Sequence, residues 1–87
     1  MLFLVHWTIT PENQRAANER FKAGGAPPPD GVRMLGRWHS VATGAGTLVC
    51  ETSDPIALCR WTHEWSDLLD FQVVPAVDDQ GVATVIG

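Results

Sequence analysis

The chain begins two helices in the same way, and each start follows a segment with the residue pattern of a strand. Thr10-Pro11-Glu12 and Asp54-Pro55 both place a capping side chain before a proline, which is favoured at the first helical position. The segments before them, residues 2–9 and 47–52, carry the apolar and β-branched alternation of strands. Two strand-to-helix units therefore organise the chain.

The remaining segments complete a recognisable order. Residues 32–41 predict a second strand, which a glycine-rich turn at 43–46 joins to the third strand as a hairpin. Residues 71–77 predict a fourth strand, and its Pro75 favours a sheet edge. No structure is predicted for residues 78–87. The order βαββαβ is that of the ferredoxin-like α+β fold, a four-stranded antiparallel sheet with two helices on one face.

The size of the chain bears on its assembly. Its 87 residues, 45% of them hydrophobic, fit a single ferredoxin-like domain spanning residues 1–87. A chain this short buries only about 60–65% of its unfolded surface, and the predicted fold leaves one sheet face without helices. We therefore expect a homodimer formed through the open sheet face.

The net charge and the short apolar start of the chain argue against nucleic acid and membranes as partners. The net charge is −4 and the six basic residues are scattered, whereas phosphate binding needs clustered Lys and Arg, so nucleic acid is not expected. The apolar start, residues 1–5, is far shorter than the roughly 20 residues of a membrane span, and a cytoplasmic location is expected. Cys50 and Cys59 have no metal-ligand or disulfide-framework spacing, and we expect reduced thiols.

The run Gly-Arg-Trp-His at 36–39 should supply both faces of the second strand, because neighbouring residues of a strand point to opposite sides. If Trp38 shares a face with Leu48, the hairpin sorts into an apolar side and a polar side. The opposite register would mix the two kinds of residue, so we adopt the first. It predicts that Trp38 packs in the core and that Arg37 and His39 lie on the open face.

Four side chains that can carry chemistry then share the open face, with Gln72 as a further member: His6, Arg37, His39 and Glu51. The histidines could act as acid and base or bind a metal with Glu51, but no metal-binding spacing supports a metal site. Hydrogen bonds across a dimer interface are the simpler interpretation. Arg37 opposite Glu51 predicts an ion pair; alternatively, Arg37 is a clamp for a ligand carboxylate.

Four tryptophans are many for so short a chain: Trp7, Trp38, Trp61 and Trp65. All are predicted at the boundary between helices and sheet, where each can bury about 150–250 Å². Core packing is the simpler interpretation, and the alternative is an aromatic pocket for a flat organic ligand. The candidate ligand-binding residues are Arg37, His39, Trp38 and Trp7. The candidate catalytic residues are His39, His6 and Glu51.

A short bacterial family known only as a domain of unknown function resembles the chain in three segments. They are Phe3-Leu4-Val5-x-Trp7, the Gly-Arg-Trp-His run, and Trp65-Ser66-Asp67-Leu68-Leu69-Asp70-Phe71 with Pro75 following. The resemblance implies the dimeric α/β-barrel group, in which two ferredoxin-like sheets meet. That group is similar in fold to cofactor-independent monooxygenases, isomerases, haem proteins and barrels without a known reaction, so it implies no single activity.

Three functions follow as hypotheses. The first is a homodimeric barrel that binds a small, flat, anionic or carbonyl-bearing organic molecule without a cofactor or metal. The second is a cofactor-independent enzyme, monooxygenase- or isomerase-like, in which His39 moves a proton on such a ligand. The third is a structural or interaction module whose open sheet face serves only to dimerise.

Overall fold

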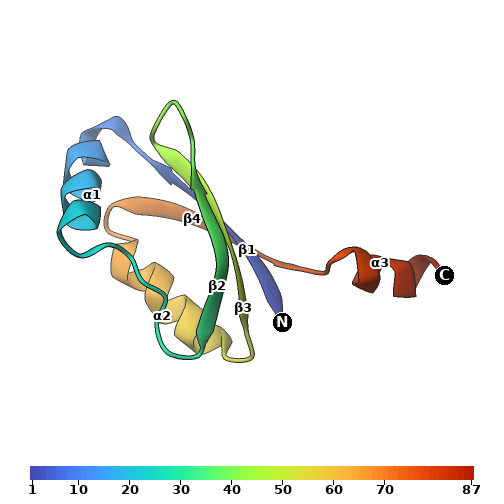
Figure 1. The fold of residues 1–87 in the computed structure, drawn as a ribbon. Coiled ribbons are helices and arrows are strands. Elements are labelled where there is room, and N and C mark those ends of the chain that lie inside the picture. Colours follow the sequence, from blue (N-terminus) through green and yellow to red (C-terminus); the bar gives the residue numbers. More distant parts are fainter.

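Seven elements follow one another in the computed structural model, which describes residues 1–87 (Figure 1). They are β1 (Leu2–Ile9), α1 (Pro11–Gly24), β2 (Val32–His39), β3 (Ala45–Thr52), α2 (Pro55–Trp65), β4 (Leu69–Ala76) and α3 (Asp79–Ile86). The first six have the predicted order βαββαβ, and the ferredoxin-like α+β fold is confirmed. The last, α3, replaces a tail for which the sequence predicts no structure.

Both predicted helix starts are confirmed, and the caps explain their positions. The Asp54 carboxylate accepts hydrogen bonds from the backbone N–H groups of Ile56 and Ala57, at 3.1 and 3.3 Å. Thr10 has the extended backbone of a cap residue but donates and accepts no side-chain capping bond. Gly25, at φ +66°, ends α1 in the left-handed region that glycine adopts without strain.

The four strands form one antiparallel sheet in the order β2-β3-β1-β4, so β4 lies at an edge, as Pro75 predicts. Helices α1 and α2 cover one face of this sheet, and the other face carries no element of the chain (Figure 1). We call the covered side the inner face and the bare side the outer face. Strand alternation then assigns each side chain of β1 to one of them.

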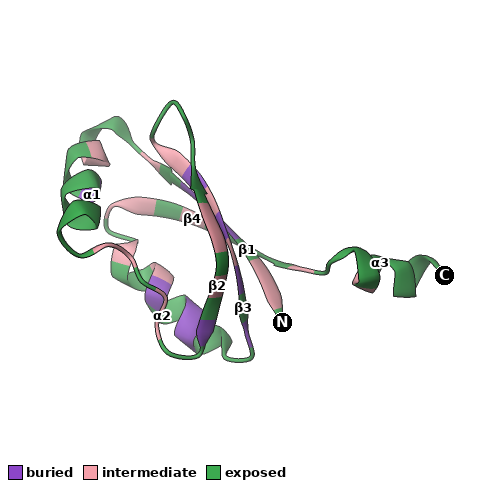
Figure 2. Ribbon diagram, viewed as in Figure 1, coloured by how far each residue is buried: buried purple, intermediate pink, exposed green.

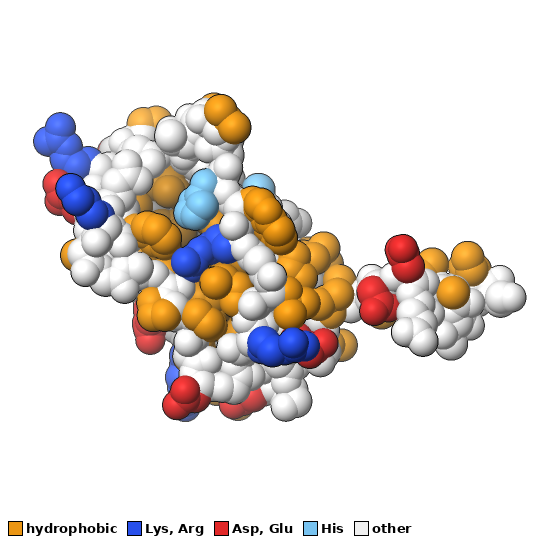
Figure 3. All heavy atoms as spheres, viewed as in Figure 1, with side chains coloured by type: hydrophobic (Ala, Val, Ile, Leu, Met, Phe, Trp, Pro, Cys, Tyr) orange, Lys and Arg blue, Asp and Glu red, His pale blue; other side chains and the backbone are white.

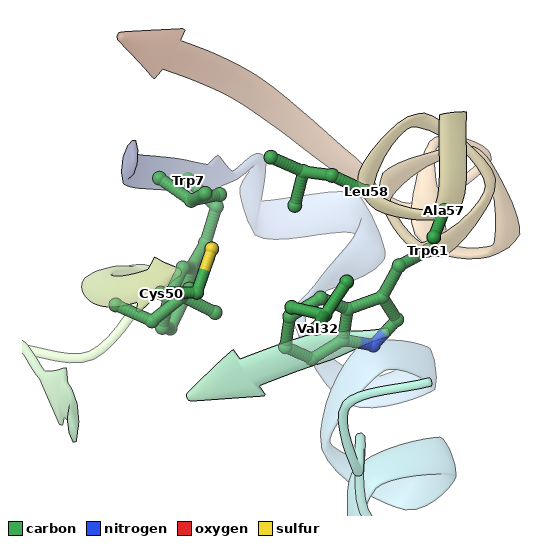
Figure 4. Packing of buried hydrophobic residues seen from close by; sticks show 8 residues of the cluster. Trp7, Val32, Cys50, Ala57, Leu58 and Trp61 are labelled. Carbon is green, nitrogen blue, oxygen red and sulfur yellow. The ribbon is translucent and has the colours of Figure 1, made fainter. Parts of the chain in front are cut away.

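The hydrophobic core lies between the central strands and α2. Its eight buried residues include Val5 and Trp7 of β1, Leu48 and Cys50 of β3, and Trp61 of α2. Figure 4 shows Leu58 and Trp61 directed from α2 toward the strands. Helix α1 contributes only Ala17 to the buried set, and Figure 2 shows α1 mostly exposed. The packing between α1 and the sheet is therefore looser than that under α2.

The predicted register of the hairpin is wrong beyond Met34, because β2 contains a bulge. Met34 pairs with Cys50, but Gly36 pairs with Val49, so two residues of β2 oppose one of β3. Val32 and Met34 face inward as predicted. After the bulge every side chain of β2 exchanges faces, and Arg37 pairs with Leu48 on the inner side.

Trp38 is therefore not a core residue. Its side chain lies on the outer face with 61% of its surface exposed. A Cβ at Gly36 would stand 2.4 Å from the Trp38 ring, so the ring lies over the backbone of that glycine. Trp7 covers Gly46 in the same way on the inner face, where a Cβ would stand 2.1 Å from the ring. Glycine admits an aromatic ring against the backbone at both positions.

Helix α3 stands apart from the sheet and the other two helices (Figure 1). None of its residues is buried. The Asp78 carboxylate caps it by accepting from the Gly81 N–H at 2.8 Å. None of the helices is long and apolar enough to cross a membrane.

Candidate functional site

A cavity of about 480 Å³ lies between α1, α2 and the inner face of the sheet. Eleven of its sixteen lining residues are hydrophobic. Trp7 and Leu48 form its floor on the sheet, Phe21 closes it on the α1 side, and Trp61 and Trp65 close it on the α2 side. The loose packing of α1 over the sheet leaves this space open. We call it the inner pocket.

Arg37 brings a cation into the inner pocket. Its guanidinium donates to the backbone carbonyl of Ala26 at 2.7 Å and lies 5.1 Å from the centre of the Phe21 ring. Partial burial lowers the pKa of Arg37. The two ion pairs of the chain, Arg20–Asp67 and Arg33–Glu51, do not include it. Arg37 is therefore a partly desolvated cation without a carboxylate partner.

His39 lies beside Arg37 at the rim of the inner pocket. Its ring meets those of Trp7 and Phe21 edge to face, with centroids 5.5 and 5.6 Å apart. Among the histidine rings, only that of His6 is hydrogen-bonded within the chain. The nitrogens of His39 are consequently available to a ligand. In Figure 3 a histidine and a basic side chain are visible among hydrophobic side chains between α1 and β2.

The charges around the inner pocket are of one sign. Its lining contains Lys22, Arg37 and His39 and no aspartate or glutamate. The whole chain, in contrast, has a formal net charge of −4. The basic groups are thus gathered around an apolar cavity in an otherwise acidic protein, which favours an anion at this place.

The sheet separates the residues that the sequence places together. Arg37 and His39 lie on the inner face, whereas His6 and Glu51 lie on the outer face. The predicted Arg37–Glu51 ion pair is wrong: Glu51 pairs with Arg33, whose hydrogen bond lowers the pKa of that carboxyl. A proton relay or metal site that joins His39 with His6 or Glu51 is excluded by this geometry.

The other candidates divide between the two faces as well. Trp7 lines the inner pocket together with Arg37 and His39, while Trp38 lies on the outer face. His6 bonds through Nδ1 to the Thr47 hydroxyl at 2.9 Å, across β1 and β3. No three side chains of His, Cys, Asp or Glu lie close enough together to hold a metal ion.

Sequence reasoning misses the contribution of α1 to the pocket. Asn18, Phe21 and Lys22 line the cavity from this helix, with Asn18 about one turn before the other two. Their spacing of three and four residues places them on one side of a helix. That spacing could predict a pocket-lining side of α1 only if Arg37 is placed on the same face of the sheet. The predicted register instead places Arg37 on the opposite face.

The outer face has a different character. Several large hydrophobic side chains are exposed there, among them Leu4, Trp38 and Val74. They lie on β1, β2 and β4, and His6 stands among them on β1. We call this surface, together with Leu35 at the bulge, the outer patch. Exposed apolar patches of this kind mark sites of association.

The whole chain, residues 1–87, matches the family DUF3303, a domain of unknown function. The protein therefore belongs to this family, which confirms the predicted membership of a family without a known activity. No protein of curated function matches the chain.

The solved structures similar to the chain include the following two. The protein Rv0793 from Mycobacterium tuberculosis matches with a TM-score of 0.53 and 16% identity over 90% of this chain and 96% of that chain. A protein from Deinococcus radiodurans, described provisionally as an antibiotic biosynthesis monooxygenase, matches with a TM-score of 0.48 and 11% identity over 90% and 94%. The first likeness supports the fold, and at these identities neither carries an activity over to this chain.

Proposed function

We propose that the protein is a homodimer that binds a small, flat, anionic organic molecule in the inner pocket without a bound cofactor. One observation carries the proposal: Arg37 stands in an aromatic cavity with no carboxylate beside it. The Ala26 carbonyl and the Phe21 ring replace part of its hydration, but no negative charge balances this partly buried cation within the chain. A ligand carboxylate or phenolate supplies the missing charge and accepts from the guanidinium.

The size and lining of the cavity suit such a ligand. Small-molecule sites typically measure about 300–1,000 Å³ and combine apolar walls with a few placed polar groups. The inner pocket, at about 480 Å³, falls in this range. The rings of Trp7 and Phe21 offer flat contacts to an aromatic molecule, and Arg37 and His39 orient its charged end.

A metabolite panel tested by thermal shift examines this proposal. We expect flat aromatic anions to raise the melting temperature of the protein, since a ligand that binds only the folded state stabilises it. The effect should disappear in Arg37→Gln, which removes the positive charge and keeps a polar, hydrogen-bonding side chain. The matched control is Arg33→Gln, because Arg33 lies on the outer face and pairs with Glu51. Stabilisation that persists in Arg37→Gln would overturn the site.

The homodimer rests on the outer patch. Leu4, Trp38 and Val74 are 39%, 61% and 43% exposed, although all three belong to strands of the sheet. Pairing two such faces would remove this apolar surface from water without altering the inner pocket. The two sheet faces would then have separate roles, ligand binding on one and assembly on the other.

A second function, catalysis, is favoured by the free ring of His39. A ring nitrogen at the rim of a cationic pocket, free of hydrogen bonds within the chain, can accept or donate a proton, and His39 could therefore move a proton on the bound anion. We expect such an enzyme to exchange a carbon-bound hydrogen of its ligand with deuterium in D₂O, and His39→Gln to abolish the exchange while ligand binding persists. If every ligand in the panel binds without hydrogen exchange, the protein is a binding protein and not this kind of enzyme. If no ligand binds, the third hypothesis, a structural module, is supported.

A further inference from the structure

We infer that α3 is an arm that docks on the second copy of this chain. The inference rests on the proposed homodimer and adds a second contact to it. Val82, Val85 and Ile86 recur at helical spacing and form one apolar side of α3, with Gln80 and Thr84 on the opposite side. Val85 and Ile86 are 83% and 80% exposed. This apolar side is therefore largely exposed to solvent, most of all at Val85 and Ile86.

The composition of α3 shows that it needs a surface to pack on. It has eight residues, whereas isolated helices shorter than about 12–15 residues are marginal in water. It also contains Gly81 and a run of β-branched residues, which are poor helix formers. The cap at Asp78 is worth only about 1 kcal/mol. Packing of the apolar side of α3 against another molecule would supply the stabilisation of the helix that its local interactions do not provide.

The join between α3 and the sheet positions the arm. Val77 lies against the backbone of Gly81, where a Cβ would stand 2.7 Å from the Val77 Cβ. The strand before it, β4, carries Val74 and Ala76 on the outer face. The apolar surface of the outer patch thus continues along the chain into the arm. Figure 1 shows that the arm extends past the end of the sheet and away from its own helices.

The area of the outer face points to the same partner. Four strands of eight residues each cover a flat area of about 500 Å², from a spacing of about 4.8 Å and a rise of about 3.3 Å per residue. Two such faces give about 1,000 Å² of flat area, so with protruding side chains they reach only the lower part of the roughly 1,200–2,000 Å² of accessible surface that stable interfaces bury. In a twofold dimer each arm contact occurs twice, so the two arms would enlarge this modest interface.

The test measures the dimer dissociation constant by sedimentation equilibrium. The arm variant is Val85→Asp with Ile86→Asp, and the control is Val41→Asp, because Val41 is a fully exposed valine outside the arm and the outer patch. We expect the arm variant to raise the dissociation constant at least tenfold and the control to change it less than twofold. Both variants should keep the circular dichroism of the folded protein, since neither site is buried.

A cross-linking experiment identifies the occupant directly. A photoreactive residue at position 85, in a mixture of ¹⁵N-labelled and unlabelled chains, should give cross-links between the two isotopes. If the wild-type chain dimerises and the arm variant has the same dissociation constant, or if cross-links form within one chain only, the arm is overturned and the dimer stands. A wild-type chain that stays monomeric would overturn both. Ligand binding in the inner pocket is measured separately, by thermal shift.

Discussion

The two faces of this sheet are made from the same four strands, yet they differ in what they expose. On β1, Val5 is fully buried on the inner face while its neighbour Leu4 is 39% exposed on the outer face. On β2 the contrast is reversed: polar Arg37 and His39 face inward, and aromatic Trp38 faces water. The reversal agrees with the proposed pocket on the inner face near β2, since packing alone would favour Trp38 inside.

The two faces should differ most in how stability responds when an aspartate is introduced on the inner or on the outer side of β1. Val5→Asp buries an unpaired carboxylate in the core and should lower the free energy of unfolding by more than about 3 kcal/mol. Leu4→Asp leaves the core intact and should weaken the proposed dimer at least tenfold. Urea denaturation, performed below the dimer dissociation constant, measures the first effect, and sedimentation measures the second. Equal losses of stability in the two variants would break the contrast.

The two glycines under tryptophan rings offer a smaller test. A Cβ at Gly46 would overlap the Trp7 ring, which is buried and cannot move freely. Gly46→Ala should therefore cost about 1–3 kcal/mol of stability, the range for overpacking. At Gly36 the overlapping ring belongs to exposed Trp38, which can swing into solvent, so Gly36→Ala should cost less than about 1 kcal/mol. Thermal unfolding of both variants checks the order, and a larger loss for Gly36→Ala would contradict it.

The exposed ion pairs should give the smallest effects. Arg20 binds Asp67 at 2.7 and 3.0 Å and lowers the pKa of that carboxyl by hydrogen bonding. A carboxyl with a lowered pKa in the folded state stabilises the protein at pH values above its pKa in the unfolded state, which is about 3.9 for Asp. This stabilisation is lost as the pH falls through the pKa of the folded state.

Asp67→Asn should accordingly lower stability slightly at pH 7 and by less at about pH 2, because protonation of Asp67 at low pH removes the charge that the asparagine lacks. Glu51→Gln removes the ion pair with Arg33 on the outer face and should also lower stability at pH 7, by a smaller amount than Asp67→Asn. The Asp67 pair should contribute more, because its partner Arg20 is also held in place by the Glu64 carbonyl and the Trp65 ring. Urea denaturation at both pH values measures the difference. A loss of equal size at low pH would show that the carboxylate charge is not its cause.

Much of the fold could be predicted because its signals are local. The two proline helix starts and the strand alternation on β1 are complete within a few residues. The assignment of Gln72 to the open face is confirmed, because Gln72 pairs with His6 of β1. The third helix could not be predicted, since Gly81 and its β-branched neighbours disfavour a helix in isolation.

The site could be predicted only in part, and one residue explains why. Sorting apolar from polar residues assumes a uniformly apolar interior, and a binding pocket violates that assumption. The sorting rule therefore moved Arg37 outward and Trp38 inward. An isolated glycine within a strand often marks a bulge, and Gly36 was such a marker. With the bulge included, Arg37 and His39 would have joined Trp7 on the correct face.

The account depends most on Arg37 as the anchor of an anionic ligand. Its most direct test is calorimetric titration with two molecules of nearly equal shape, naphthalene-2-carboxylate and the neutral 2-naphthamide. We predict that the wild-type protein binds the carboxylate at least tenfold more tightly than the amide, and that Arg37→Gln removes this preference. Equal affinity for both molecules in the wild type, or an undiminished preference in Arg37→Gln, would contradict the account.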